Sequence, residues 1–150
     1  MKNYYFKPTF RRRHSNVESN HQITVINHLR RAYPEALFNI SPANTTNPFH
    51  GKQNKRMGLQ KGCPDIMLFE PRSIYHALFI ELKRPELRDY ELNVYQTKGV
   101  LSKEQKNWIE KLNARGFKAV VCYGADEAIR EIDSYMNRET KNFSKTLDKV

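Results

Sequence analysis

The sequence predicts an α/β fold in which a mixed β-sheet is flanked by helices, with elements in the order α-β-β-β-α-β-α. Near-continuous apolar runs at 66–69 and 77–80 are typical of strands that are covered on both faces. Two other segments begin with Ser-x-x-Glu or Ser-x-x-Gln and continue with apolar residues at helical spacing, which indicates capped amphipathic helices. At 150 residues, the chain is most simply one domain with its own core.

The first helix is expected to begin near Ser15, which forms a capping box with Glu18. It should end at Tyr33-Pro34, because the residue before a proline disfavours the helical conformation. Its apolar stripe is supplied by Ile23, Val25, Ile26 and Leu29.

Strands are predicted at 36–40, 64–69, 76–82 and 117–124. Between the first two lies 41–62, which is rich in Pro, Asn and Gly and carries four basic and no acidic residues. Connections of this length within a compact domain are usually functional or disordered.

A second polar connection is expected over 84–101. The helix after it begins at Ser102, whose capping box is completed by Gln105, and stops at Gly116. Trp108 shares the apolar stripe of this helix and is expected to pack in the core rather than to stack on a base.

The chain is expected to divide into three parts. A basic arm over 1–14 precedes the domain, which covers 15–138 and ends with a helix at 125–136. A polar tail follows at 139–150. The arm is either a disordered tail or a segment that touches nucleic acid.

The net charge of +10 points to an acidic partner, and nucleic acid is the commonest one for a small basic protein. A ribosomal or membrane-surface protein would share this charge. The sequence has neither a signal peptide nor an apolar run long enough to span a membrane, so a cytoplasmic location is expected. Cys63 and Cys122 lack the spacing of a zinc site or a disulfide framework.

Three charged residues next to the apolar strands carry the candidate chemistry. Glu81 and Lys83 alternate along one strand and therefore project from one face of the sheet, and Asp65 begins the preceding strand. If the two strands are antiparallel neighbours, all three side chains meet at one end of the sheet. Two carboxylates and a backbone carbonyl, that of Leu82, suit Mg²⁺, and Lys83 could orient an attacking water.

Each of these residues has a simpler interpretation. A lone Glu-x-Lys on a strand is usually an ion pair, and Pro-Asp is a common turn dipeptide. The histidines form no metal-binding pattern, and His21 and His28 are expected to be exposed. The sequence has no Gly-rich phosphate loop, so no nucleotide cofactor is expected.

In its motifs and their order, the chain resembles the PD-(D/E)XK nuclease superfamily, and specifically its VRR-NUC family. The resemblance covers about residues 15 to 125. The matching motifs are Glu18 with Gln22, Gly62-Cys63-Pro64-Asp65, Glu81-Leu82-Lys83, and Ser102-x-x-Gln105-x-x-Trp108.

The resemblance implies a restriction-endonuclease-like fold and a Mg²⁺- or Mn²⁺-dependent DNA endonuclease. It implies that Asp65 and Glu81 hold the metal and that Lys83 acts at the nucleophile. It also implies that Glu18 completes the metal site and that Gln105 supports it. Both have an alternative role, because Glu18 and Gln105 each also belong to a capping box.

Short stand-alone members, common in phage and prophage genomes, are associated with branched DNA such as four-way (Holliday) junctions and are expected to act as symmetric dimers. For such a phage protein the expected location is the cytoplasm of the bacterial host. Basic residues of the arm and the long loop would grip DNA phosphates, namely Arg11, Arg12, Arg13, Lys52, Lys55, Arg56 and Lys61. The alternative functions are a catalytically silent or partner-activated DNA-binding module and a basic scaffold protein.

Overall fold

The computed structural model describes residues 17–41, 53–89 and 94–140, and the side chains at 17, 18 and 94 lie outside this description. Four strands form the main sheet in the order β1-β2-β3-β6. Their bounds are Phe38–Ile40 (β1), Ile66–Leu68 (β2), Leu78–Lys83 (β3) and Lys118–Tyr123 (β6). β2 pairs antiparallel with both β1 and β3, whereas β3 and β6 are parallel. The predicted mixed sheet and the antiparallel pairing of the two apolar strands are therefore confirmed.

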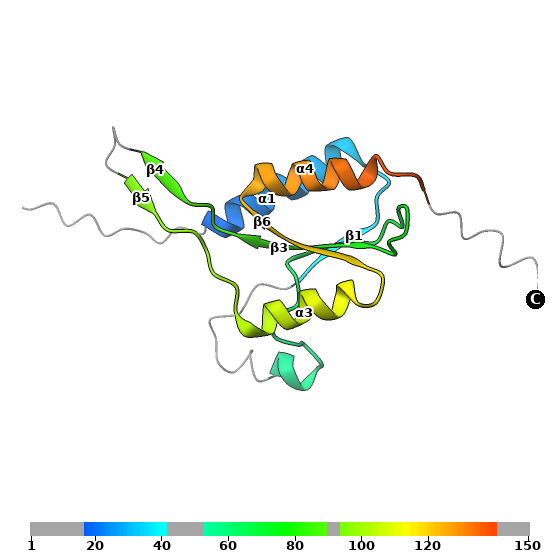
Figure 1. Cartoon of the computed structure of the whole chain (residues 1–150), viewed down its shortest axis with the longest axis horizontal. Helices are drawn as coiled ribbons and strands as arrows, with labels where there is room; N and C mark the ends of the chain where they lie inside the picture. The colour runs from blue at the N-terminus through cyan, green and yellow to red at the C-terminus, as the bar shows by residue number, and fades with distance from the viewer. Residues whose placement is uncertain (1–16, 42–52, 90–93, 141–150) are drawn as a thin grey trace, which may run out of the picture.

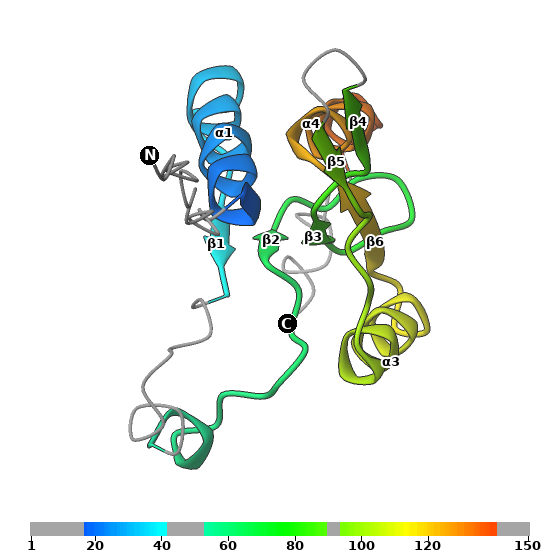
Figure 2. The same cartoon turned by 90° about the vertical axis from the view of Figure 1, so that its left-hand side faces the viewer.

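Helices cover both faces of this sheet (Figures 1 and 2). α1 (Val17–Ala32) and α4 (Ala125–Met136) pack side by side on one face, and α3 (Lys103–Asn113) lies on the other. Apart from the two short strands β4 and β5, the order of these elements agrees with the prediction, and the chain has the predicted mixed α/β architecture.

The strand β3 is buried along its whole length because it lies between these layers. Its even-numbered residues, such as Ile80, pack with Val25 and Leu29 of α1 and with Tyr135 of α4. The odd-numbered Phe79 faces α3 instead. Each large apolar side chain buried in this way contributes about 1.5–3 kcal/mol, so two of the candidate site residues, Glu81 and Lys83, lie on a firmly held strand.

The structure adds a two-stranded hairpin, β4 (Leu87–Asp89) and β5 (Val94–Gln96), between β3 and α3. The expectation that 84–101 is only a polar connection is therefore wrong. Strands of three residues with mixed polar and apolar side chains give too few positions for a period-2 pattern. Figure 1 shows the hairpin projecting from the end of the sheet.

Smaller expectations also need correction. Ile23 was placed in the apolar stripe of α1, but its side chain is 58% exposed, because it lies on the helix face opposite the buried Val25. The helix ends at Ala32, just before Tyr33-Pro34, as predicted, whereas Ser15 lies outside the described residues. Residues 53–56 form a short helical turn within the expected loop.

The strands and the tail also differ from the predicted ranges. β2 and β3 begin two residues later than expected, at Ile66 and Leu78. The first residues of the expected polar tail are not frayed: the Ser73 N–H donates to the Glu139 carbonyl at 2.8 Å, and Thr140 forms a β-bridge with Arg72. Among the described residues, no helix is long and apolar enough to cross a membrane.

Candidate active site

The antiparallel register of β2 and β3 brings the two carboxylates together. Ile66 pairs with Ile80, and continuing this register by one residue places Asp65 opposite Glu81. The Asp65 Oδ2 atom accepts a hydrogen bond of 2.8 Å from the Leu82 backbone N–H. The head of β2 therefore lies beside the tail of β3, as the sequence predicts.

Pro64 explains why the ladder ends here. The Ser41 N–H donates to the Asp65 carbonyl at 2.9 Å, so the Asp65 backbone faces β1 and that of its neighbour Pro64 faces β3. Pro64 then stands opposite Leu82, but it has no N–H to donate to the Leu82 carbonyl. In an extended strand, the N–H and C=O of one residue point to the same side. The Leu82 carbonyl thus faces β2 at Pro64, which offers it no N–H.

Glu81 and Lys83 form a buried ion pair on the α3 side of the sheet. Their residues are only 1% and 7% exposed, and Lys83 Nζ lies 2.8 Å from Glu81 Oε1. Burying two charges has a desolvation cost that their attraction only partly offsets, whereas removing one partner typically costs 3–5 kcal/mol. The buried pair is therefore weak evidence for a stabilising role and stronger evidence for a functional role.

Gln105 connects helix α3 to this pair. The Gln105 Oε1 atom accepts from the Ser102 N–H at 2.8 Å, and the Gln105 backbone N–H donates to the Ser102 hydroxyl. These two bonds complete the predicted capping box. The Gln105 Nε2 atom donates a short hydrogen bond to Glu81 Oε1. One side chain thus both caps α3 and binds Glu81, because an amide group has an acceptor and a donor. The sequence had left these two contacts as alternatives.

The segment that precedes Asp65 is fastened to α3. Trp108 Nε1 donates to the Lys61 carbonyl at 3.1 Å, and Trp108 also packs against the core, as predicted. Gly62 has a φ of +87°, and a Cβ atom there would lie 2.7 Å from the Glu104 carbonyl carbon. Only glycine fits this close approach, so the Gly-x-Pro-Asp motif fixes the distance between Asp65 and the helix.

The pKa of Cys63 reflects the burial and the negative charge of the candidate site. Burial raises the pKa of its thiol, and the nearby carboxylates of Glu81 and Asp65 raise it further, while a hydrogen bond with Ser41 acts in the opposite direction. Cys63 therefore stays a neutral thiol close to the carboxylates. At the rim, the pKa of Glu104 is lowered, first by a backbone hydrogen bond at its own residue and then by Lys61.

The donor atoms fit a hard divalent cation. Asp65 and Glu81 supply carboxylate oxygens, and the carbonyl of Leu82, the residue after Glu81, is a candidate third oxygen, a set that suits Mg²⁺ or Mn²⁺ with water completing the shell. Within the described ranges, no group of three or more His, Cys, Asp or Glu side chains is arranged as a metal site. Glu18, the expected further ligand, lies on α1 with its side chain outside the description.

The predicted DNA-binding residues are only partly placed. Lys55 and Arg56 lie exposed on the helical turn 53–56, and Lys61 is exposed and paired with Glu104. The remaining four lie outside the described residues, namely Arg11, Arg12, Arg13 and Lys52.

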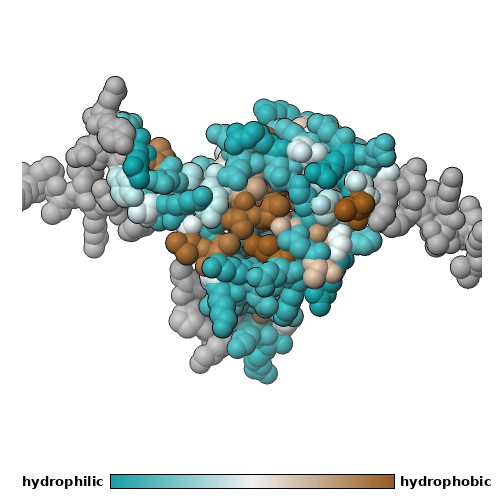
Figure 3. All heavy atoms as spheres, in the orientation of Figure 1, coloured by the Kyte–Doolittle hydropathy of each residue, from teal (hydrophilic) through white to brown (hydrophobic). Residues whose placement is uncertain are grey.

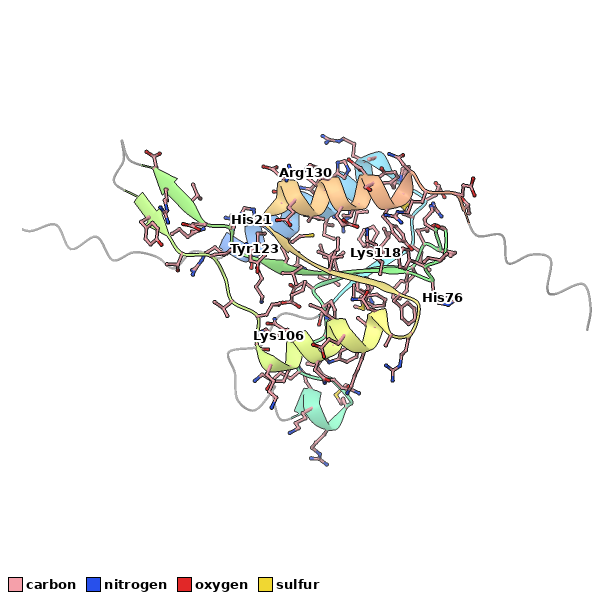
Figure 4. The ribbon with its side chains drawn as sticks, in the orientation of Figure 1. His21, His76, Lys106, Lys118, Tyr123 and Arg130 are labelled. Carbon is pink, nitrogen blue, oxygen red and sulfur yellow. The ribbon has the colours of Figure 1, made fainter. Side chains whose placement is uncertain are left out.

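Two histidines were wrongly expected to be exposed. His21 Nδ1 accepts from the Ala125 N–H at 3.2 Å, at the start of α4, and His28 lies 2.7 Å from an Asp133 carboxylate oxygen. Figure 4 labels His21 beside Tyr123 at the end of β6. Contacts between elements far apart in the sequence leave no local pattern, so neither histidine contact could be predicted from the sequence.

A family model described as the VRR-NUC domain matches residues 11–126. A solved structure titled "VRR_NUC domain protein" is 27% identical, with a TM-score of 0.64, and the match covers 84% of this chain and 93% of that chain. No curated protein matches this chain.

Proposed function

This chain belongs to the VRR-NUC domain family, and from that premise we propose that it is a divalent-metal-dependent endonuclease that hydrolyses DNA phosphodiester bonds. The nuclease-type fold and DNA as the substrate follow from the family. The observation that supports a catalytic site is the arrangement of Asp65, Glu81 and Lys83 at the shared end of β2 and β3. A fold that had lost its activity would have little reason to keep a buried Lys–Glu pair beside a second carboxylate.

Asp65, Glu81 and the Leu82 carbonyl are the proposed holders of Mg²⁺ or Mn²⁺. When bound, the cation would polarise the scissile phosphate and lower the pKa of a coordinated water. Glu18 is proposed as a further ligand, since its helix α1 packs against β3.

Lys83 is the proposed catalytic cation. Its ammonium is held by Glu81, at the position where it can orient the attacking water and stabilise charge that develops on the phosphate. Gln105 is a positioning residue, because it fixes Glu81 from the first turn of α3. The products are expected to carry 5′-phosphate ends.

For the preferred substrate we propose branched DNA, with four-way junctions as the first choice, cut by a symmetric homodimer. The support is the resemblance to short members of the family. A two-fold dimer presents two equivalent sites, which suits paired cuts across a symmetric junction.

The test uses end-labelled four-way junction, fork and linear duplex, each incubated with the protein and Mg²⁺ or Mn²⁺, with EDTA as the metal-free control. Asp65→Asn is the sharpest variant, because asparagine keeps an oxygen that can accept the Leu82 N–H but removes the negative charge. Lys83→Ala removes the proposed catalytic cation. Both should lower the cleavage rate on the order of 10²–10³-fold. Arg130→Ala, at an exposed residue of α4, is the matched control and should cut normally.

Thermal melting of each variant separates lost chemistry from lost folding. Preferential cutting of the junction supports both the endonuclease and its selectivity, and equal cutting of all three DNAs rejects only the selectivity. If every DNA is bound but stays intact with either metal, the chain is instead a silent or partner-activated DNA-binding module.

A further inference from the structure

Residues 97–99, here called the strap, cross the carboxyl end of β3 directly after Lys83. The Gly99 N–H donates to the Arg84 carbonyl at 2.9 Å. The Arg84 side chain returns the contact, with Nε 3.1 Å from the Thr97 carbonyl. Because both ends of the strap are bonded to Arg84, its position is fixed relative to the candidate site.

The strap also packs against the Lys83 side chain. A Cβ atom added at Gly99 would lie 3.3 Å from Lys83 Cβ and 3.4 Å from Lys83 Cδ. The bare backbone of Gly99 is therefore one wall of the channel in which the Lys83 stem lies. The residue before it in the strap, Lys98, is consequently held next to the candidate site.

Lys98 is held in place by an aromatic ring rather than by a carboxylate. Its Nζ lies 3.7 Å from the centroid of the Tyr123 ring, a cation–π distance, and Tyr123 is the residue of β6 paired with Lys83. Within the described part of the chain, Lys98 has no ion pair with an acidic residue. The neighbouring Glu127 carboxylate is bound to the Tyr123 N–H instead.

A cation–π contact orients an ammonium without neutralising its charge. Lys98 is exposed, so it presents a full positive charge to solvent beside the buried Lys83. A lysine ammonium is a compact point charge with three donors and binds single phosphate oxygens well. Its fixed place beside the end of β3 matches a backbone phosphate that neighbours the scissile one.

We propose that Lys98, oriented by the Tyr123 ring, is a substrate-binding residue that contacts a DNA backbone phosphate next to the one that is cut. This inference rests on the proposed function, because it requires DNA to lie across the candidate site. A phosphate contact positions DNA without reading its sequence, so the effect of Lys98 should be the same on a junction and on a duplex.

The experiment measures the affinity of the full chain for fluorescein-labelled junction and duplex by anisotropy, with EDTA present so that no cutting occurs. Each affinity is measured over a series of salt concentrations. Removing one phosphate contact should lower the steepness of log K against log salt by about 0.9. Lys98→Ala is expected to show this change on both DNAs, whereas the control Arg130→Ala keeps the wild-type steepness.

A pair of variants at Tyr123 tests the orienting ring. Tyr123→Phe keeps the ring and should bind like the wild type, and Tyr123→Leu should weaken binding because Lys98 loses its support. An unchanged steepness for Lys98→Ala, in a protein that binds and cuts DNA, overturns this inference alone. A reduced steepness in a protein that never cuts supports the contact and rejects the endonuclease. A wild-type protein that binds neither DNA overturns both.

Discussion

Single residues at the candidate site contribute both to the fold and to the arrangement of the charged side chains. Pro64 ends a strand ladder beside Asp65, and Gln105 caps a helix and binds Glu81. The sequence placed Asp65 beside Glu81 on the condition that their two strands are antiparallel neighbours, and the pairing of β2 with β3 meets that condition. The sequence could not show that Gln105 does both jobs, because that depends on where α3 lies.

At the residue scale, Gly62→Ala should lower both stability and cleavage. Gly58 is the matched control: its φ is +99° and nothing lies within 4 Å of an added Cβ. Gly58→Ala should therefore lower the free energy of unfolding only by the backbone strain, about 1–2 kcal/mol. Gly62→Ala adds to this strain a collision with the backbone of α3, which should displace Asp65.

Urea denaturation and initial cleavage rates of the two variants are the measurements. The close approach of Gly62 to α3 is refuted if both glycine variants lose the same stability and cut equally well.

At the scale of elements, the edge strand β6 is protected by side chains. Asn113, at the end of α3, accepts from the Ala119 N–H at 2.9 Å and donates to the Ala119 carbonyl at 3.0 Å. Glu127 accepts from the Tyr123 N–H at 2.8 Å. Exposed edge strands are templates for pairing with other chains, and Figure 3 shows apolar side chains gathered over β6, between α3 and α4. The side chains of Asn113 and Glu127 thus occupy backbone groups of β6 with which another strand could otherwise pair.

Asn113→Ala should therefore promote self-association. It removes two hydrogen bonds from the buried Ala119 backbone, which should lower stability by about 1–3 kcal/mol, and opens the edge of β6. Sedimentation velocity over a concentration series should show larger species than the wild type forms. Asn107→Ala, at an exposed position of α3, is the control, and identical sedimentation of both variants would argue against edge protection.

Sequence patterns predicted the main helices and strands far better than they predicted the β4–β5 hairpin or the side-chain contacts at the edge of β6. β3 and α3 are long enough for their periodicity to be read, whereas β4 and β5 have three residues each. The Asn113 contacts join a helix end to a strand, and no local signal encodes them. What the sequence withheld was therefore the set of contacts made after the elements had packed.

At the scale of the whole molecule, the hydroxyls of Tyr33 and Tyr135 join segments that are far apart in the sequence. Tyr33 and His28 of the α1 side both contact Asp133 of α4. Tyr135 is fully buried, and its hydroxyl donates to the Glu70 carbonyl at 2.6 Å. Burial raises the pKa of Tyr135 to about 12, and burial with the Asp133 carboxylate raises that of Tyr33 to about 12.

These raised pKa values predict a loss of stability in alkali. An unfolded tyrosine ionises near pH 10, whereas the folded one keeps its proton until about pH 12. The stabilisation is complete below about pH 10 and is lost as the pH rises toward about 12, by about 3 kcal/mol at most for Tyr135. Urea melts of Tyr135→Phe should show a shallower decline over this range than the wild type.

The exposed Tyr95 provides the control: Tyr95→Phe should decline with pH as steeply as the wild type. Equal declines for Tyr135→Phe and the wild type would show that Tyr135 is not the group responsible.

The parallel pairing of β3 with β6 also sets the order in which the candidate site is assembled in a newly made chain. β2 and β3 are near in sequence and can pair as soon as both have left the ribosome, whereas Lys118, the partner of Leu78, follows the hairpin and α3. Distant contacts form late in folding, and synthesis proceeds from the N-terminus. Gly124, whose N–H binds the Lys83 carbonyl, is made later still. A chain that has been made only as far as β3 therefore has Asp65 and Glu81 but lacks the strand that pairs with Lys83, so the candidate site is assembled only after β6 has been made.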